Sequence, residues 1–184
     1  MYQYALPILN ERAGTGNPFF SVLLSISNHP PYVIPPYFHP HSDVLEEQIV
    51  EYADWSIRQF MQAAEKQPWF DNTIFVFLGD HGKMVGTPEC EMPQSYNHIP
   101  LMIYGKDIKP GVYDGFGGQV DVSPTLLGLL NISYLQNNFG VNLLEEERPC
   151  MFFTADNLIG ARDSVNMFIY SPDSQQEFKY KLEE

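Results

Sequence analysis

The sequence predicts an α/β fold: a mostly parallel sheet covered by helices on both faces, followed by a short pair of strands near the C-terminus. Three runs, at 18–26, 73–78 and 99–105, are apolar on both faces, which is typical of strands buried in a parallel sheet. Segments with helical spacing of apolar residues alternate with these runs. The 184 residues fit one domain of ordinary size, so residues 1–184 are expected to form a single domain.

The first two helices are predicted from their spacing and end signals. Residues 2–10 are expected to be the last turns of a helix that breaks at Pro7. The second helix is expected to begin at Asp43, with Glu46 completing a capping box, and to run to about Gln67. Together they would cover part of the sheet.

The C-terminal third contains one more helix and two apolar runs. The segment "DVSPTLLGLLNI" is expected to be helical, with Ser123 as its N-cap and Pro124 in its first turn. The runs "CMFFTA" and "MFIYS" are expected to form a pair of strands joined near "NLIGARDS". The tail "QQEFKYKLEE" is polar.

Composition excludes several classes of partner. The chain is 44% hydrophobic and 18% charged, with a formal net charge of −13, so it can bury a core but offers no basic surface for nucleic acid or an anionic membrane. An anionic substrate would therefore need a bound cation. Cys90 and Cys150 have no zinc-site spacing, and two unrelated thiols are favoured over a disulfide.

The segment "TIFVFLGDHG" drives an apolar strand directly into Asp80 and His81, between Gly79 and Gly82. In open α/β sheets, ligands gather beyond the carboxyl ends of the strands. A carboxylate and an imidazole form a partial ligand set for a divalent cation, provided that the chain turns at Asp80. Glycines allow a close backbone approach and unusual conformations. A turn with a capping Asp and a solvated His is the alternative interpretation.

Other histidines flank the predicted strands. His29 follows the strand at 18–26, which would bring it to the same edge of a parallel sheet as Asp80. His98 precedes the strand at 99–105, so it would lie at the far end, unless the loop before it folds back. His39 and His41 lie in the long proline-rich loop after His29.

The order of these motifs resembles the sulfatase family of the alkaline phosphatase superfamily. The pieces are "NPFFSVLLSISNHPPY", "DNTIFVFLGDHG", "NHIPLMIYG", "GGQVDVSPTLLGLL" and "FGVNLL", which are collinear with the family from about residue 1 to 145. The segment around His29 and the "YADWSIRQF" helix are most similar to the lipoteichoic acid synthase-like phosphoglycerol transferases. The resemblance implies an alkaline phosphatase-like fold, present here in part.

The resemblance also assigns residues. It implies that Asp80 and His81 ligate a divalent ion (Mn, Mg, Zn or Ca), and that His29 and His98 contact a phosphate or sulfate ester. The nucleophile of the family, a Thr, Ser or modified Cys, belongs to a region upstream of the one this chain matches, and no C-x-P-x-R is present. The chain resembles the C-terminal half of a catalytic domain. Alone, it is expected to be inactive and not to retain the ion.

The resemblance further implies an extracytoplasmic enzyme whose parent is anchored by upstream membrane helices. Three functions stay open: phosphoglycerol transfer or hydrolysis, sulfuric ester hydrolysis, and a non-catalytic module that associates with itself, for example as a homodimer through an exposed sheet edge. A degenerate binding protein would follow if the complete protein lacked a nucleophile. Asp121 and Thr125 are expected to be structural, with Asp121 bonding to the first turn of its helix.

Overall fold

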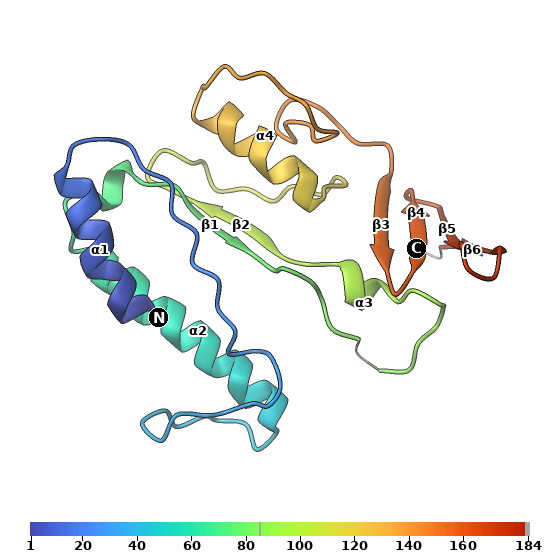
Figure 1. Ribbon diagram of the computed structural model, residues 1–184, viewed down its shortest axis with the longest axis horizontal. Helices are drawn as coiled ribbons and strands as arrows, with labels where there is room; N and C mark the ends of the chain where they lie inside the picture. Colours follow the sequence, from blue (N-terminus) through green and yellow to red (C-terminus); the bar gives the residue numbers. More distant parts are fainter. Residues whose placement is uncertain (85, 183–184) are drawn as a thin grey trace. The chain divides into compact units, whose positions relative to one another are not determined.

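The computed structural model describes residues 1–84 and 86–182 (Figure 1). The chain divides into two compact units, each with its own internal contacts. The first unit comprises residues 1–75 with 103–108, and the second comprises the remaining residues. The organisation as a single domain stays a prediction.

Two helices pack against each other in the first unit. α1 spans Tyr2–Gly14 and α2 spans Leu45–Ala64. The helix predicted at 2–10 is confirmed, but it continues through Pro7 instead of breaking there. Pro7 lies on an exposed part of α1, so the carbonyl that loses its N–H partner can bond to water. The buried residues between the two helices are Leu9, Phe60 and Ala64.

The start of α2 differs from the predicted capping box at Asp43 and Glu46. The N-cap is Val44, whose N–H donates to Ser42 Oγ at 3.0 Å, and the Ser42 hydroxyl donates to Glu47 Oε2 at 2.5 Å. The N–H of the N-cap residue is therefore bonded by a serine two residues before it, and the predicted capping box of Asp43 and Glu46 is not formed. Although α2 has 20 residues, no helix in the described part of the chain is long and apolar enough to cross a membrane.

The segment 18–26 is not a strand, contrary to the prediction. It forms no ladder with any strand in the described ranges. Its alternate apolar side chains are 69–86% exposed: Phe20, Val22, Leu24 and Ile26. A run of β-forming residues becomes a strand only when a neighbour supplies its hydrogen bonds, and the residues that the structure describes supply none to this segment.

The two predicted strands around the Asp80 segment are confirmed. The 3₁₀ turn η1 (Phe70–Asn72) leads into β1 (Phe75–Leu78), which pairs with β2 (Leu101–Tyr104). Backbone hydrogen bonds beyond β1 join residue 79 to residue 100 and residue 82 to residue 96. Along these pairs the residue number increases on the β1 side and decreases on the β2 side, so β1 and β2 run antiparallel. The short helix α3 (Gln94–Asn97) lies shortly before β2 in the chain (Figure 1).

The helix α4 spans Gln119–Leu129, so it begins four residues before the predicted cap at Ser123. Its N-cap is Gly118, and Ser123 lies inside the helix with Pro124. The first turn forms earlier because the Asp121 carboxylate accepts the Gly118 N–H at 2.9 Å. The prediction placed Asp121 before the helix cap, but Asp121 lies inside the first turn and bonds back to the N-cap residue.

A four-stranded antiparallel meander follows α4. It consists of β3 (Met151–Ala155), β4 (Leu158–Arg162), β5 (Asn166–Ser171) and β6 (Gln176–Lys181), paired in that order. The sequence predicted two of these strands, β3 and β5. The connecting segment and the polar tail form the two additional strands, β4 and β6. In β6, Phe178 and Tyr180 pack toward the buried cluster of Met92, Met167 and Ile169, while charged residues alternate with them.

Candidate metal and substrate site

The backbone bends at Asp80, two residues after the end of β1, and residues 79–82 form what is called the turn below. The Gly79 N–H donates to the Pro100 carbonyl at 3.3 Å, and the Gly82 N–H donates to the Tyr96 carbonyl at 3.0 Å. Both glycines therefore lie against the chain that leads into β2, and the two residues between them are held at that end of the strand pair.

The two glycines are required for close approach. A Cβ on Gly82 would lie 2.1 Å from the carbonyl oxygen of Ser95, and a Cβ on Gly79 would lie 3.1 Å from Cβ of Ile99. Neither glycine has a positive φ. Of the two reasons for glycine at these positions, the close approach is therefore confirmed, and a left-handed backbone is not needed.

The side chains of Asp80 and His81 turn toward each other. His81 Nε2 lies 3.8 Å from Asp80 Oδ2, and the two side chains are 66% and 71% exposed, respectively. His81 Nδ1 lies 2.8 Å from the Gly82 carbonyl oxygen. A carbonyl oxygen can only accept a hydrogen bond, so in neutral His81 the proton belongs on Nδ1 and the lone pair on Nε2.

This arrangement fits two ligands of one divalent cation. Metal–oxygen and metal–nitrogen bonds are each about 2.0–2.2 Å, so two ligand atoms on one ion can be up to about 4 Å apart. The separation of 3.8 Å between Nε2 and Oδ2 lies within that reach. Metal-binding histidines also commonly donate their other ring N–H to a backbone carbonyl, as His81 does to Gly82. The described residues contain no cluster of three or more His, Cys, Asp or Glu that could complete the shell.

His98 lies in the chain segment that runs beside the turn. It follows α3, and its N–H donates to the Gln94 carbonyl at 2.7 Å. Because residues 96 and 100 bond to Gly82 and Gly79, His98 lies opposite Asp80 and His81. The sequence left two placements of His98 open. The placement at the far end of the strand is wrong, because it assumed that the two strands are parallel.

His29 lies in the first compact unit, whereas Asp80, His81 and His98 lie in the second. Its ring is exposed, and Nδ1 lies 2.8 Å from the Pro30 carbonyl oxygen, which leaves Nε2 open as in His81. That His29 shares an edge with Asp80 stays a prediction.

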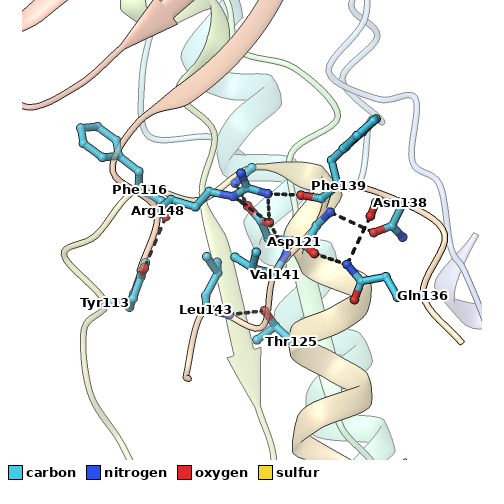
Figure 2. A network of polar contacts seen from close by, with 12 residues as sticks. Tyr113, Phe116, Asp121, Thr125, Gln136, Asn138, Phe139, Val141, Leu143 and Arg148 are labelled. Carbon is cyan, nitrogen blue, oxygen red and sulfur yellow. Dashed lines mark hydrogen bonds and ion pairs between the residues drawn. The ribbon is translucent and has the colours of Figure 1, made fainter. Parts of the chain in front are cut away.

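A second carboxylate, Asp121, is fully buried in a polar network (Figure 2). Its oxygens accept bonds from the Arg148 guanidinium at 2.6–2.8 Å, from the Val141 N–H at 2.8 Å and from the Gly118 N–H at 2.9 Å. Burial alone would raise the pKa of Asp121, but these hydrogen bonds and the charge of Arg148 lower that pKa below its ordinary value. Thr125 is also buried, and its Oγ1 accepts the N–H of Leu143 at 3.1 Å.

The sequence pattern missed one residue that touches the turn. Gln119, the first residue of α4, donates from Nε2 to the carbonyl oxygens of Gly79 and Asp80, at 3.1 Å and 2.8 Å. A single exposed glutamine carries no signal of its own. Only its place in the "QVDVSPTLLGLL" motif marks it.

Comparison with known proteins decides the family. A sequence model of the sulfatase family matches residues 1–132. The chain belongs to the sulfatase family. Lipoteichoic acid synthase 1 from Bacillus subtilis (strain 168) is 25% identical over 194 residues, covering 88% of this chain and 29% of that protein. Choline-sulfatase from Rhizobium meliloti (strain 1021) is 29% identical over 121 residues, covering 58% of this chain and 22% of that protein.

A solved structure gives the same family fold. A protein in the alkaline phosphatase superfamily from Vibrio parahaemolyticus superposes with a TM-score of 0.82 at 24% identity, covering 99% of this chain and 48% of that one. The predicted α/β fold class is thereby confirmed, with a C-terminal group of antiparallel strands. This sulfatase-family chain spans under a third of the length of the curated relatives it matches.

Proposed function

We propose that the complete protein is a metal-dependent enzyme that acts on phosphate or sulfate esters through a covalent intermediate. Transfer or hydrolysis of a phosphoglycerol-type group is the favoured reaction. In this proposal, Asp80 and His81 supply part of the shell of a divalent ion (Mn, Mg, Zn or Ca), and His29 and His98 contact the ester. The nucleophile is not among the residues assigned in this chain, so the chain alone is inactive.

One observation carries the proposal: the facing pair of His81 Nε2 and Asp80 Oδ2, 3.8 Å apart at the end of β1. The hydrogen bond from Nδ1 to the Gly82 carbonyl supports the tautomer that a metal needs. Both side chains are exposed, so a ligand can reach them. The lipoteichoic acid synthase relatives, which cover most of this chain, favour the phosphoglycerol branch.

When bound, a divalent ion in this superfamily would lower the pKa of a nucleophile and neutralise the oxygens of the ester. The residues of this chain would orient the ion and the ester and would transfer a proton to the leaving oxygen. Asp80 and His81 would hold their oxygen and nitrogen in fixed directions. His98, in the neighbouring segment, would donate a hydrogen bond to an ester oxygen.

His29 suits the transfer of a proton to the leaving oxygen. Its Nδ1 is engaged with the Pro30 carbonyl, so Nε2 is the atom that would face the substrate. As imidazolium, Nε2–H can donate to the departing oxygen, and as neutral imidazole it can take a proton back in the second step. The same group would thus serve both halves of a two-step reaction.

The proposed substrate is anionic, while the chain carries a formal net charge of −13. Attraction of the ester would therefore depend on the ion and not on the general field of the protein. We also propose an extracytoplasmic location, with the parent protein anchored to the membrane by segments upstream of this region. The lipoteichoic acid synthase relatives support this location.

The proposal is tested by titrating Mn²⁺ into this chain and its Asp80→Asn variant by calorimetry. We expect weak binding, above the micromolar range, that disappears in the variant, together with no hydrolysis of aryl phosphate or aryl sulfate esters. The Asp163→Asn variant is the control, because Asp163 is a half-buried carboxylate whose Oδ1 accepts hydrogen bonds within its own turn, from residues 165 and 166. Micromolar binding or clear turnover would refute the idea that this chain holds only part of the site.

Sulfate ester hydrolysis is the second candidate, supported by the choline-sulfatase relative. The two reactions are separated by assaying the complete protein with matched aryl sulfate and glycerol phosphodiester substrates. Preference for the sulfate ester would replace phosphoglycerol transfer as the favoured reaction. The metal ligands would stay the same.

Self-association is a third candidate, supported by the exposed apolar stripe of the segment 18–26. Four alternate side chains of this stripe are 69–86% exposed: Phe20, Val22, Leu24 and Ile26. An extended segment with an unpaired edge can pair with a second copy. Light scattering should show a dimer that the Leu24→Lys variant converts to monomer, whereas a clean monomer in the unaltered chain contradicts this candidate.

A further inference from the structure

We propose that Gln119 is a positioning residue that sets the direction in which Asp80 and His81 point. The inference deepens the proposed function and rests on it. It comes from the contact of one side-chain amide with two successive carbonyl oxygens of the turn. Gln119 Nε2 donates to Gly79 O at 3.1 Å and to Asp80 O at 2.8 Å.

The peptide unit between Asp80 and His81 is held at both ends. Its carbonyl oxygen accepts from Gln119, and its N–H donates to Asp80 Oδ1 at 2.9 Å. The orientation of this unit, together with the dihedral angles on either side of it, sets the directions in which both side chains leave the backbone. Gln119 thus restrains the one peptide that relates the two proposed ligands.

The side chains themselves receive little restraint from packing. His81 and Asp80 are 66% and 71% exposed, so no core holds their orientation. Besides the Gln119 contacts, the turn is held by the glycine N–H groups and by the bond from His81 Nδ1 to Gly82 O. A ligand pair on an exposed turn needs such supports, because small errors in position weaken metal binding.

Gln119 is itself anchored firmly. It is the first residue of α4, and the same turn of that helix contains Asp121, which is buried against Arg148 (Figure 2). Asp121 Oδ2 accepts the N–H of Gly118, the residue directly before Gln119. The buried ion pair therefore fixes the start of the helix, and Gln119 transmits that position to the turn.

The test compares Gln119→Met with Gln136→Met. Gln136 is a matched control, because it is exposed and its Nε2 also donates to two backbone carbonyls, those of Asn138 and Gly140, away from the turn. Methionine keeps the length of glutamine and removes the donor. We measure amide hydrogen exchange of residues 79, 81 and 82 without metal, and then Mn²⁺ affinity.

In Gln119→Met, exchange at residues 79, 81 and 82 should rise about fivefold or more, as expected for the loss of one or two hydrogen bonds. The Mn²⁺ affinity should fall by a similar factor. Gln136→Met should change neither quantity. A Gln119→Glu variant should also bind Mn²⁺ less tightly, although its added negative charge alone would favour binding.

Unchanged exchange at the turn in Gln119→Met would overturn the inference whether or not metal binds. Faster exchange with unchanged Mn²⁺ affinity would overturn it as well. Failure of the proposed function has a different signature: Mn²⁺ binding by the unaltered chain that Asp80→Asn does not reduce. In that case the exchange data alone decide whether Gln119 orders the turn.

Discussion

Asp80 and Asp121 are two carboxylates in the same compact unit, and they differ in almost every physical respect. The side chain of Asp121 is fully buried and accepts hydrogen bonds from a guanidinium and two backbone N–H groups. The side chain of Asp80 is 71% exposed, and its Oδ2 faces an imidazole nitrogen at 3.8 Å, beyond hydrogen-bonding distance.

The difference separates a structural carboxylate from one that is available to a ligand. The lone pairs of Asp121 are used inside the protein, where an unpaired charge would be costly. Asp80 keeps Oδ2 open while Gln119 donates to its carbonyl oxygen and the neighbouring Gly79 N–H donates to the Pro100 carbonyl, just before β2. A fixed backbone with an open side chain is what a ligand site requires.

The largest difference between the two carboxylates is expected when the charge of each one is removed. Asp121→Asn leaves Arg148, whose side chain is only 16% exposed, without its ion pair, so the free energy of unfolding should fall by about 3–5 kcal/mol. Asp80→Asn should change it by about 0.5 kcal/mol or less, because the side chain is exposed. Urea unfolding measures both, and similar losses in the two variants would contradict the assignment of roles.

The substitution of Gly82 should cause the next largest loss in the free energy of unfolding. In Gly82→Ala the new Cβ meets a backbone carbonyl, that of Ser95, at 2.1 Å, which cannot be relieved by a side-chain rotation. The free energy of unfolding should fall by about 1–3 kcal/mol, and the turn should lose Mn²⁺ binding. Gly111→Ala is the control, since nothing lies within 4 Å of its Cβ position. Equal unfolding midpoints for the two variants would refute the tight approach.

Acid should affect the two carboxylates differently. The pKa of Asp121 is lower in the folded chain than in the unfolded chain, where it is about 3.9. Its contribution to stability is therefore complete above that unfolded value, and it is lost as the pH falls through the folded pKa. The stability gap between the unaltered chain and Asp121→Asn, measured in urea from pH 6 to pH 2, should narrow below about pH 4. A gap independent of pH would contradict the ion pair.

The smallest effect is expected at Ser123, which the sequence pattern marks as an N-cap. Because Ser123 lies inside α4 and is exposed, Ser123→Ala should change the free energy of unfolding by about 0.5 kcal/mol or less. A true N-cap would lose about 1 kcal/mol. Thermal unfolding distinguishes the two and shows whether the helix begins at Gln119.

Sequence patterns predicted the elements that carry their own signal. The apolar run ending in Asp80 and His81 became β1 and its turn, and the spacing of apolar residues located α2 and α4. The segment 18–26 was predicted wrongly because a strand also needs a partner, which an apolar pattern cannot supply. The strand β6 was missed because Glu and Lys on its exposed face concealed the alternation of Phe178 and Tyr180.

The candidate site was predictable only where neighbours in the sequence are neighbours in space. Asp80 and His81 are adjacent, so one turn suffices to bring them together. The positions of His98 and Gln119 beside that turn depend on strand direction and on the start of a helix, neither of which a local pattern determines. Family resemblance named His98 but not Gln119.

Nuclear magnetic resonance of the five histidines shows whether Asp80 and His81 face one cation. On addition of substoichiometric Mn²⁺, the ring signals of His81 should broaden first, and this selective broadening should vanish in Asp80→Asn. Equal broadening of all five histidines, or broadening at His81 that persists in Asp80→Asn, would contradict the account.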